Sequence, residues 1–380
     1  MREEIRTKVA AEIKRRGLDA IVTTSPENFA YLNGFTVPSQ SLLRHRHAIA
    51  ILSADGAFSL LVVDMEEATV RGLAPNTQVA VWKEFSESAM KRLTDELRTR
   101  GLSKARLGLE FKYLSAGDHL ELSKLCPSAT FETCDELLRD ARQIKTTGEI
   151  DLMRRLARIS DTAILRAMES VREGSSEFDF ASALTTNVFS QGAEQFRLMI
   201  VATGERSQLP NVGPTGRRLQ AQDVCRFEIF SLISGYQVGV CRTAVVGTPP
   251  PHAERIWAHL IDCKYMVMDL VKPGASCIEI YQRFAAKLAE LDLPPISFVG
   301  HGAGLSLHEE PYMGRTAVIG KQNDVILHEN MVLGIEPLSY RTGYGFGMQN
   351  KDAILITADG CELLSDVTDT DRLFVIKAVD

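Results

Sequence analysis

A short glycine-rich stretch, "VGHGAGLSLHEEP" at residues 299–311, combines side chains that could do chemistry. It contains His301 and His308, and the second histidine is followed directly by Glu309 and Glu310. Imidazoles and carboxylates can ligate a divalent ion, and they can also exchange protons near neutral pH. The stretch therefore indicates a metal site, a general acid–base site, or a glycine-rich turn that only happens to hold histidines.

Three other stretches place polar residues inside apolar surroundings. They are "VCRFEIF" with Glu228, "GYQVGVCRT" with Cys241 and Arg242, and "MVLGIEP" with Glu336. A carboxylate on a buried strand is unfavourable unless it is paired or ligated, so the glutamates and histidines predict one convergent site. The simpler interpretation stays open for each residue alone, because a strand glutamate can form a salt bridge and a cysteine can fill a core.

Hydrophobic periodicity predicts the elements that must position these residues. In the first part of the chain, helical patterns alternate with strand patterns, which predicts an α/β domain with a mixed sheet over residues 1–141. The sequence "TTGE" is typical of a capping box that begins a long helix. Further helices and strands then predict an α+β domain over residues 142–380. The expected strands of this second domain are at 196–202, 224–232, 236–247, 331–337 and 352–357, and the expected helices are at 177–191, 252–271 and 276–291.

The bulk composition limits the classes of function. The chain has 380 residues and a net charge of −6 without a long basic run, so nucleic acid is not an expected partner. The charged N-terminal pattern has no apolar core of a signal peptide, and no long apolar run suits a membrane, so we expect a cytoplasmic protein. The seven scattered cysteines contain no CxxC pair, which indicates reduced thiols rather than disulfides or structural zinc.

The order of the motifs resembles the creatinase/prolidase/aminopeptidase P family (M24), the pita-bread proteins. Five stretches carry the resemblance in the family's order along nearly the whole chain: "SPENFAYLNGF", "RQIKTTGEIDLMRRLARISD", "GYQVGVCRTAVVG", "GHGAGLSLHEEP" and "MVLGIEP". The resemblance implies a creatinase-type N-terminal domain, a C-terminal pita-bread domain and a homodimer. It also implies that Arg44, His45 and His47 of one subunit reach the active site of the other.

The resemblance also locates the metal ligands of the family's peptidases, which hold two divalent ions with two Asp, one His and two Glu. These positions fall on Glu228, Gly239, His301, Glu336 and Lys351. Glycine offers no side-chain ligand and lysine adds a positive charge, so no dinuclear metal centre and no other cofactor are expected. A single divalent ion on Glu228, His301 and Glu336 stays open as an alternative.

Creatinase, a family member without the metal ligands, suggests what chemistry could remain. We expect Lys351 to take over the electrostatic role of the metal by pairing with Glu228 and Glu336. One of these carboxylates, or His308, would then be the general base, with His301 beside them.

The same resemblance assigns substrate-binding positions. Cys241 stands where creatinase has a substrate-binding glutamate, and Asn211 stands where it has its catalytic histidine. The expected substrate contacts are Cys241, Arg242, Asn211 and Glu309. A nucleophilic Cys241 is a lesser alternative.

The expected function is therefore a hydrolase that cleaves an amide, amidine or guanidino C–N bond of a small, amino-acid-like or dipeptide-like substrate by metal-independent acid–base chemistry. One alternative is a metal-dependent Xaa-Pro dipeptidase or aminopeptidase. The other is a pseudoenzyme whose cleft binds a peptide or protein.

Overall fold

A computed structural model describes residues 1–315 and 324–379 of the chain. The chain divides into two compact units, Met1–Arg142 and Gln143–Asp380, which we call the N-terminal unit and the C-terminal unit. Along the described residues, no helix is both long enough and apolar enough to cross a membrane.

The N-terminal unit is built around a mixed six-stranded sheet with the order β4-β3-β2-β1-β5-β6. Strand β1 pairs antiparallel with β2 and parallel with β5, so the predicted mixed sheet is confirmed. Serine side chains cap three of the helices, because Ser25, Ser88 and Ser115 each accept a hydrogen bond from a backbone N–H of the first turn. The strands are β1 (Ala20–Thr23), β2 (Ile49–Ser53), β3 (Phe58–Val63), β4 (Gln78–Trp82), β5 (Arg106–Leu109) and β6 (Thr130–Thr133). The helices are α1 (Arg2–Arg15), α2 (Pro26–Asn33), α3 (Pro38–Leu42), α4 (Glu67–Leu73), α5 (Ala89–Thr99), α6 (Ala116–Leu125) and α7 (Asp135–Gln143).

The C-terminal unit contains two larger sheets and a short two-stranded one. The first has the order β17-β9-β8-β7, the second has the order β11-β10-β12-β15-β16, and β13 pairs with β14. The strands are β7 (Gln195–Thr203), β8 (Val224–Ile233), β9 (Tyr236–Val246), β10 (Phe298–Gly302), β11 (Glu309–Gly314), β12 (Val332–Ile335), β13 (Leu338–Ser339), β14 (Met348–Gln349), β15 (Asp352–Ile356), β16 (Cys361–Leu363) and β17 (Phe374–Ile376). The helices are α8 (Thr147–Ser170), α9 (Glu177–Ser190), α10 (Ala253–Leu270) and α11 (Cys277–Glu290).

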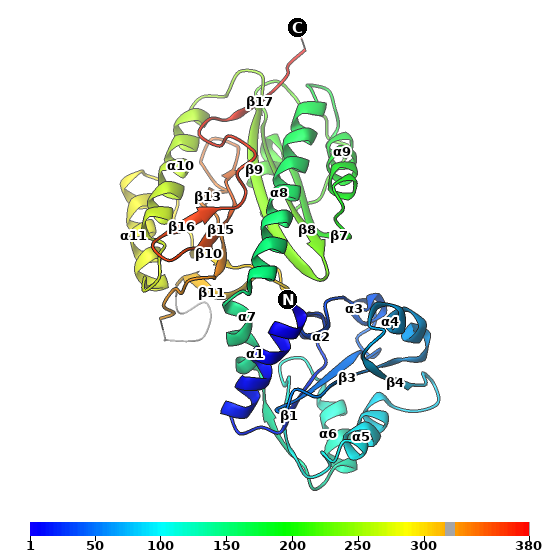
Figure 1. The fold of residues 1–380 in the computed structure, drawn as a ribbon. Helices are drawn as coiled ribbons and strands as arrows, with labels where there is room; N and C mark the ends of the chain where they lie inside the picture. Colours follow the sequence, from blue (N-terminus) through cyan, green and yellow to red (C-terminus); the bar gives the residue numbers. More distant parts are fainter. Residues whose placement is uncertain (316–323, 380) are drawn as a thin grey trace. The chain divides into compact units, whose positions relative to one another are not determined.

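Helices enclose these sheets on two sides of the C-terminal unit. Figure 1 shows α8 and α9 beside strands β7 to β9, while α10 and α11 lie beside the sheet that contains β10 and β15. One apolar core joins Trp257 and Leu260 of α10 and Phe284 of α11 to Leu333 and Ile354 of the second sheet. The antiparallel strand pairs and the enclosing helices confirm the predicted α+β class for this unit.

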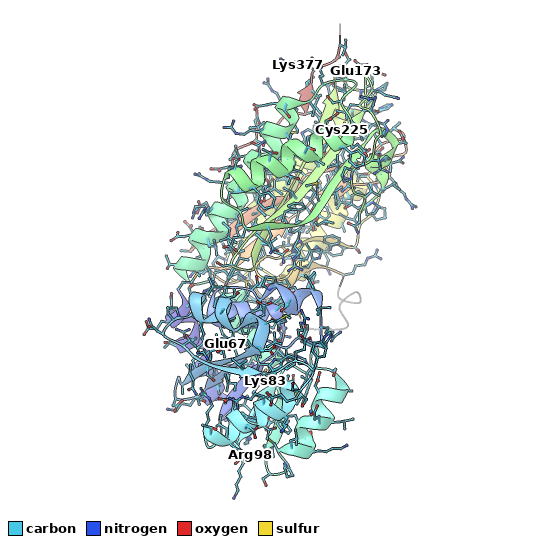
Figure 2. The ribbon with its side chains drawn as sticks, turned by 90° about the vertical axis from the view of Figure 1, so that its right-hand side faces the viewer. Glu67, Lys83, Arg98, Glu173, Cys225 and Lys377 are labelled. Carbon is cyan, nitrogen blue, oxygen red and sulfur yellow. The ribbon has the colours of Figure 1, made fainter. Side chains whose placement is uncertain are left out.

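A local signal begins α8, and a long-range contact holds the C-terminal segment. Thr146 and Glu149 form the predicted capping box of α8, each accepting a hydrogen bond from the other's backbone N–H. At the far end of the unit, the backbone N–H of Glu173 donates to the carbonyl of Lys377 at 2.9 Å, and both residues are labelled in Figure 2. The C-terminal segment is thereby held beside the first sheet, where β17 pairs with β9.

Candidate active site

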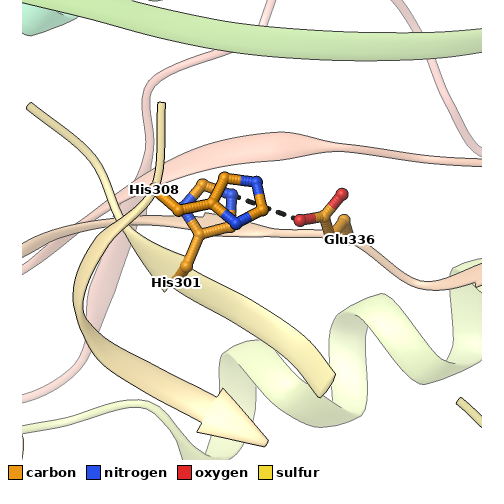
Figure 3. A group of neighbouring side chains, drawn as sticks. All are labelled: His301, His308 and Glu336. Atoms are coloured by element: carbon orange, nitrogen blue, oxygen red, sulfur yellow. Dashed lines mark ion pairs between the residues drawn. The ribbon is translucent and has the colours of Figure 1, made fainter. Parts of the chain in front are cut away.

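His301, His308 and Glu336 meet at the second sheet of the C-terminal unit (Figure 3). Their ligating atoms all lie within 4.8 Å of one another. Nε2 of His301 lies 3.2 Å from Oε1 of Glu336, and the His301 and His308 rings stack with centroids 3.8 Å apart. His301 and Glu336 are buried, whereas His308 is exposed, so His308 is the member of this cluster that solvent can reach.

Strand pairing fixes the buried part of this cluster. His301 of β10 is paired with Gly334 of β12, two residues before Glu336. A Cβ on Gly334 would lie 3.4 Å from the His301 ring and 3.4 Å from Cε of Lys351, so this backbone position is in contact with both side chains. The register between β10 and β12 therefore places His301 beside Glu336.

Glu309 holds the turn that carries His308. Its Oε1 accepts hydrogen bonds from the backbone N–H groups of Leu305 at 2.8 Å and Ser306 at 2.9 Å, and its Oε2 lies 3.7 Å from Lys145. These contacts favour a positioning role for Glu309, not the substrate contact expected from the sequence.

Glu228 and Lys351 lie next to the cluster. Nζ of Lys351 is 3.4 Å from Oε1 of Glu228 and 3.5 Å from Oε1 of Glu336, and all three side chains are nearly fully buried. Lys351 precedes β15, and its backbone forms a bridge with Cys241 on β9. Cys241 is also the register partner of Glu228, so one backbone junction brings the lysine to the carboxylate.

Phe230 covers Gly239 on the same face of the first sheet. The two residues are register partners, and a Cβ on Gly239 would lie only 2.4 Å from the Phe230 ring. Nζ of Lys351 lies 4.5 Å from the centroid of the same ring, within range of a cation–π interaction. The position that the resemblance assigned to a metal-binding aspartate is therefore filled by an aromatic ring.

The pKa values of the groups in this cluster are shifted in different directions. Burial raises the pKa of Glu228. Burial acts in the same direction on Glu336, but Lys351 and His301 outweigh it and lower the pKa of Glu336 to about 2. Burial would lower the pKa of Lys351, yet Glu336 and Glu228 outweigh it and raise that pKa. Two neighbouring carboxyl groups with opposite shifts are typical of sites that move protons.

His308 also has a shifted pKa. Desolvation of the partly covered ring comes first among the causes, and the neighbouring His301 and Lys351 add to it, so the pKa of His308 is lowered. The imidazole of His308 is therefore neutral near pH 7, with a free acceptor nitrogen, and is a weaker base than an ordinary histidine.

Gln349 and Arg226 complete the surroundings of Glu336, and the sequence interpretation missed both. Nε2 of Gln349 donates to Oε2 of Glu336 at 3.0 Å, while Oε1 of Gln349 accepts from Nη1 of Arg226 at 2.9 Å. Arg226 lies under the ring of Tyr340, whose hydroxyl also donates to Gln349 at 3.3 Å. The only sequence signal was position: Gln349 lies two residues before Lys351, and Arg226 lies two residues before Glu228.

Arg242 is buried in an internal charge network. Its guanidinium lies 3.0 Å from Oδ2 of Asp161 and 2.9 Å from Oδ1 of Asp352, and it donates to the carbonyls of Cys241 and Lys351. A guanidinium with these partners supports the backbone on both sides of the Cys241–Lys351 bridge. This favours a positioning role over the substrate contact that the sequence suggested.

The remaining predicted contacts lie in different surroundings. Cys241 is fully buried, and burial followed by the charge of Glu228 raises the pKa of its thiol well above the usual range. Asn211 is exposed and follows Pro210, whose carbonyl accepts a hydrogen bond from Arg226 at 2.9 Å.

In the N-terminal unit, Arg44, His45 and His47 line a cavity of about 480 Å³. Their reach into a second subunit stays a prediction.

A larger cavity of about 580 Å³ opens beside Tyr340. Its lining includes Leu209, Pro210, Ile296, Tyr340 and Arg341. Since the Tyr340 hydroxyl bonds to Gln349, which in turn bonds to Glu336, two hydrogen bonds connect this cavity to the carboxylate.

The side chains do not fit a pair of divalent ions. Gly239 and Lys351 offer no ligand, Phe230 fills the space over Gly239, and the ammonium group lies between the two remaining carboxylates. One ion between His301 and Glu336 has better support. Nδ1 of His301 lies 2.8 Å from the carbonyl of Gly302 and must donate to it, so a neutral ring would turn the Nε2 lone pair toward the Glu336 carboxylate. A proton or a metal ion at Nε2 would remove this repulsion.

Comparisons with known proteins agree with the fold and the motifs. The sequence profile of metallopeptidase family M24 matches residues 151–358, and that of the creatinase/prolidase N-terminal domain matches residues 6–144. An Xaa-Pro dipeptidase of Pyrococcus furiosus is 28% identical over 312 residues, which cover 80% of this chain and 86% of that protein. The creatinase of a Bacillus species is 24% identical over 371 residues, which cover 94% of this chain and 88% of that protein.

Solved structures share the fold. The prolidase from Pyrococcus horikoshii superposes with a TM-score of 0.80 at 25% identity, covering 96% of this chain and 99% of that one. The prolidase from Thermococcus sibiricus gives a TM-score of 0.84 at 22% identity, covering 100% and 99% of the two chains, and shows the shared fold. The prediction of a pita-bread hydrolase of the creatinase or Xaa-Pro peptidase type is confirmed at the level of the family. Because the M24 profile spans more than half of its residues, this protein belongs to metallopeptidase family M24.

Proposed function

We propose that this protein hydrolyses the C–N bond of a small, dipeptide-like substrate at the cluster of His301, His308 and Glu336. The observation that carries the proposal is the environment of Glu336. One of its oxygens faces His301 and Lys351, the other accepts from Gln349, and a neutral, exposed imidazole lies beside it. A carboxylate held in this way can orient an attacking water, and the imidazole can exchange protons with it.

The roles of the side chains follow from their charges and burial. Glu336, with its low pKa, stays ionised and accepts a hydrogen bond from the water. His308 takes a proton and returns it to the departing amine, since it is neutral and open to solvent. The fixed ammonium group of Lys351 stabilises negative charge that develops on the carbonyl oxygen.

The substrate class rests on the relatives and on the neighbouring cavity. Proteins similar to this chain along most of its length are named Xaa-Pro dipeptidases and creatinase. The cavity beside Tyr340, at about 580 Å³, suits a small ligand with an apolar side chain. Arg341 lines it, and among residues 1–315 and 324–379 the structure gives this guanidinium no ion-pair partner, so it could bind a substrate carboxylate.

A second candidate is the metal-dependent form of the same reaction. The family description as metallopeptidases and the dipeptidase relatives support it better than the metal-independent chemistry expected from the sequence. The structural support is the set of donors on His301, His308 and Glu336, which lie within 4.8 Å of one another. A divalent ion on these residues would act as a Lewis acid and lower the pKa of a bound water.

The test is hydrolysis of a panel of Xaa-Pro and non-proline dipeptides, with chelator and with added Mn²⁺, Co²⁺ or Zn²⁺. Release of free amino acids in chelator would favour the ion-free reaction, and release only with added metal would favour the second candidate. An absence of hydrolysis under every condition would contradict both and would favour the pseudoenzyme alternative.

A further inference from the structure

We propose that the ammonium group of Lys351 is a resident cation, which takes the place that a divalent ion would otherwise occupy between Glu228 and Glu336. Two facing carboxylates are a common site for a hard cation. Here the lysine lies between them, with Nζ at 3.4 Å from one Oε1 and 3.5 Å from the other.

Several contacts keep the lysine in this place. Its backbone exchanges both hydrogen bonds with Cys241, each with an N-to-O distance of 3.1 Å. Its side chain is buried, and its Nζ lies 4.5 Å from the centroid of the Phe230 ring. A buried side chain held by this many neighbours cannot swing aside to admit an ion without breaking the local packing.

Electrostatic repulsion also disfavours a divalent ion between Glu228 and Glu336. With both carboxyl groups ionised, the two carboxylates and the ammonium carry a net charge of −1, whereas the carboxylates alone would carry −2. A divalent ion beside Lys351 would also meet a like charge at short range in a poorly solvated place, which is strongly unfavourable. The single-ion candidate on His301, His308 and Glu336 shares the Glu336 carboxylate with this arrangement, so Lys351 should weaken that site as well.

The inference uses the same residues as the proposed function, but its test does not depend on turnover. Mn²⁺ and Zn²⁺ binding would be titrated by calorimetry for the wild-type protein, Lys351→Met and Lys264→Met. Lys264 is a matched control, because it is also buried and paired with a carboxylate, with Nζ at 2.9 Å from Oδ2 of Asp352. We expect Lys351→Met to tighten metal binding by at least about tenfold, whereas Lys264→Met should not. Unchanged affinity in Lys351→Met, or an equal gain in both variants, would overturn the inference.

A conservative second variant covers the case in which Lys351→Met does not fold. Glu228→Gln keeps the shape of the side chain. If no ion lies between Glu228 and Glu336, this change should leave the number of ions retained by the protein after dialysis the same, as measured by elemental mass spectrometry. Retention of two ions per chain by the wild type, or loss of an ion in Glu228→Gln, would contradict a resident lysine cation. The metal affinity and the number of retained ions both test the inference even if the protein hydrolyses no dipeptide.

Discussion

Cys241 and Lys351 exchange both of their backbone hydrogen bonds, each with an N-to-O distance of 3.1 Å, and so join the two larger sheets of the C-terminal unit. This junction places the Lys351 side chain next to Glu228, the partner of Cys241 in the first sheet. Cys241 therefore contributes backbone hydrogen bonds that join the sheets, while its thiol is buried beside the Glu228 carboxylate.

Replacement of Cys241 by alanine should consequently leave activity within about threefold of the wild type. Burial and the charge of Glu228 raise the pKa of the thiol, so little thiolate exists at neutral pH to act as a nucleophile. The measurement is kcat/KM for the best dipeptide, together with the rate of iodoacetamide labelling at Cys241. Cys361, which is partly exposed, is the internal comparison for labelling. A loss of activity of about a hundredfold or more would instead support the nucleophilic cysteine.

Gly239→Ala should destabilise the protein, because the new methyl group would lie 2.4 Å from the Phe230 ring. The ring would have to move, at a cost of about 1–3 kcal/mol in the free energy of unfolding. Urea unfolding measures this difference. Gly213→Ala is the matched control, since a Cβ there has nothing within 4 Å and should change stability little. Equal stability of the two variants would show that Phe230 does not fill this space.

Asp352→Asn should have an effect on stability that depends on pH. Burial would raise the pKa of Asp352, but Arg242 and Lys264 outweigh burial and lower it to about 2. A carboxyl group with a lowered pKa stabilises the folded state above its unfolded pKa, and this contribution is lost as the pH falls from about 4 to about 2.

The difference in unfolding free energy between wild type and Asp352→Asn should therefore be about 3 kcal/mol near neutral pH and should shrink below about pH 4. Urea unfolding at a series of pH values provides the measurement. A difference that stays constant down to about pH 2 would contradict the network of Asp352 with Arg242 and Lys264.

Arg341→Ala should raise KM for a dipeptide by about tenfold and change kcat little, because the guanidinium lines the cavity and does not contact the reacting groups. Steady-state kinetics with a dipeptide and its C-terminal amide would check this, since the amide lacks the carboxylate and should show no difference between the proteins. Arg372→Ala, at another exposed arginine, is the control. An equal loss for dipeptide and amide would argue against a carboxylate contact at Arg341.

Much of the fold could be predicted because its signals are local. The capping box at Thr146, the apolar runs of β8 and β9 and the 3.6-residue periodicity of α8 each lie within a short stretch of chain. The short strands β13, β14 and β17 could not be predicted in this way. They contain two or three residues each, too few to show a period, and only pairing makes them strands: β13 pairs with the nearby β14, and β17 pairs with the distant β9.

The site was predictable in its residue types and less so in its contacts. His301, His308 and Glu336 come together, and Lys351 lies between Glu228 and Glu336, as the motifs led us to expect. The other side-chain contacts depend on how the chain folds back on itself in three dimensions. Glu309 turns toward its own loop, Arg242 turns into a buried network, and Gln349 reaches Glu336, none of which can be read from spacing along the chain.

The most direct test of the account compares dipeptide hydrolysis by the wild type, Glu336→Gln, His308→Ala and His259→Ala, the last being a control histidine on α10. Each reaction would be followed by release of free amino acid, in chelator and with each added metal. The account predicts measurable hydrolysis by the wild type and by His259→Ala, and losses of about 10²–10⁴-fold in the other two variants. Hydrolysis that survives both Glu336→Gln and His308→Ala would contradict it.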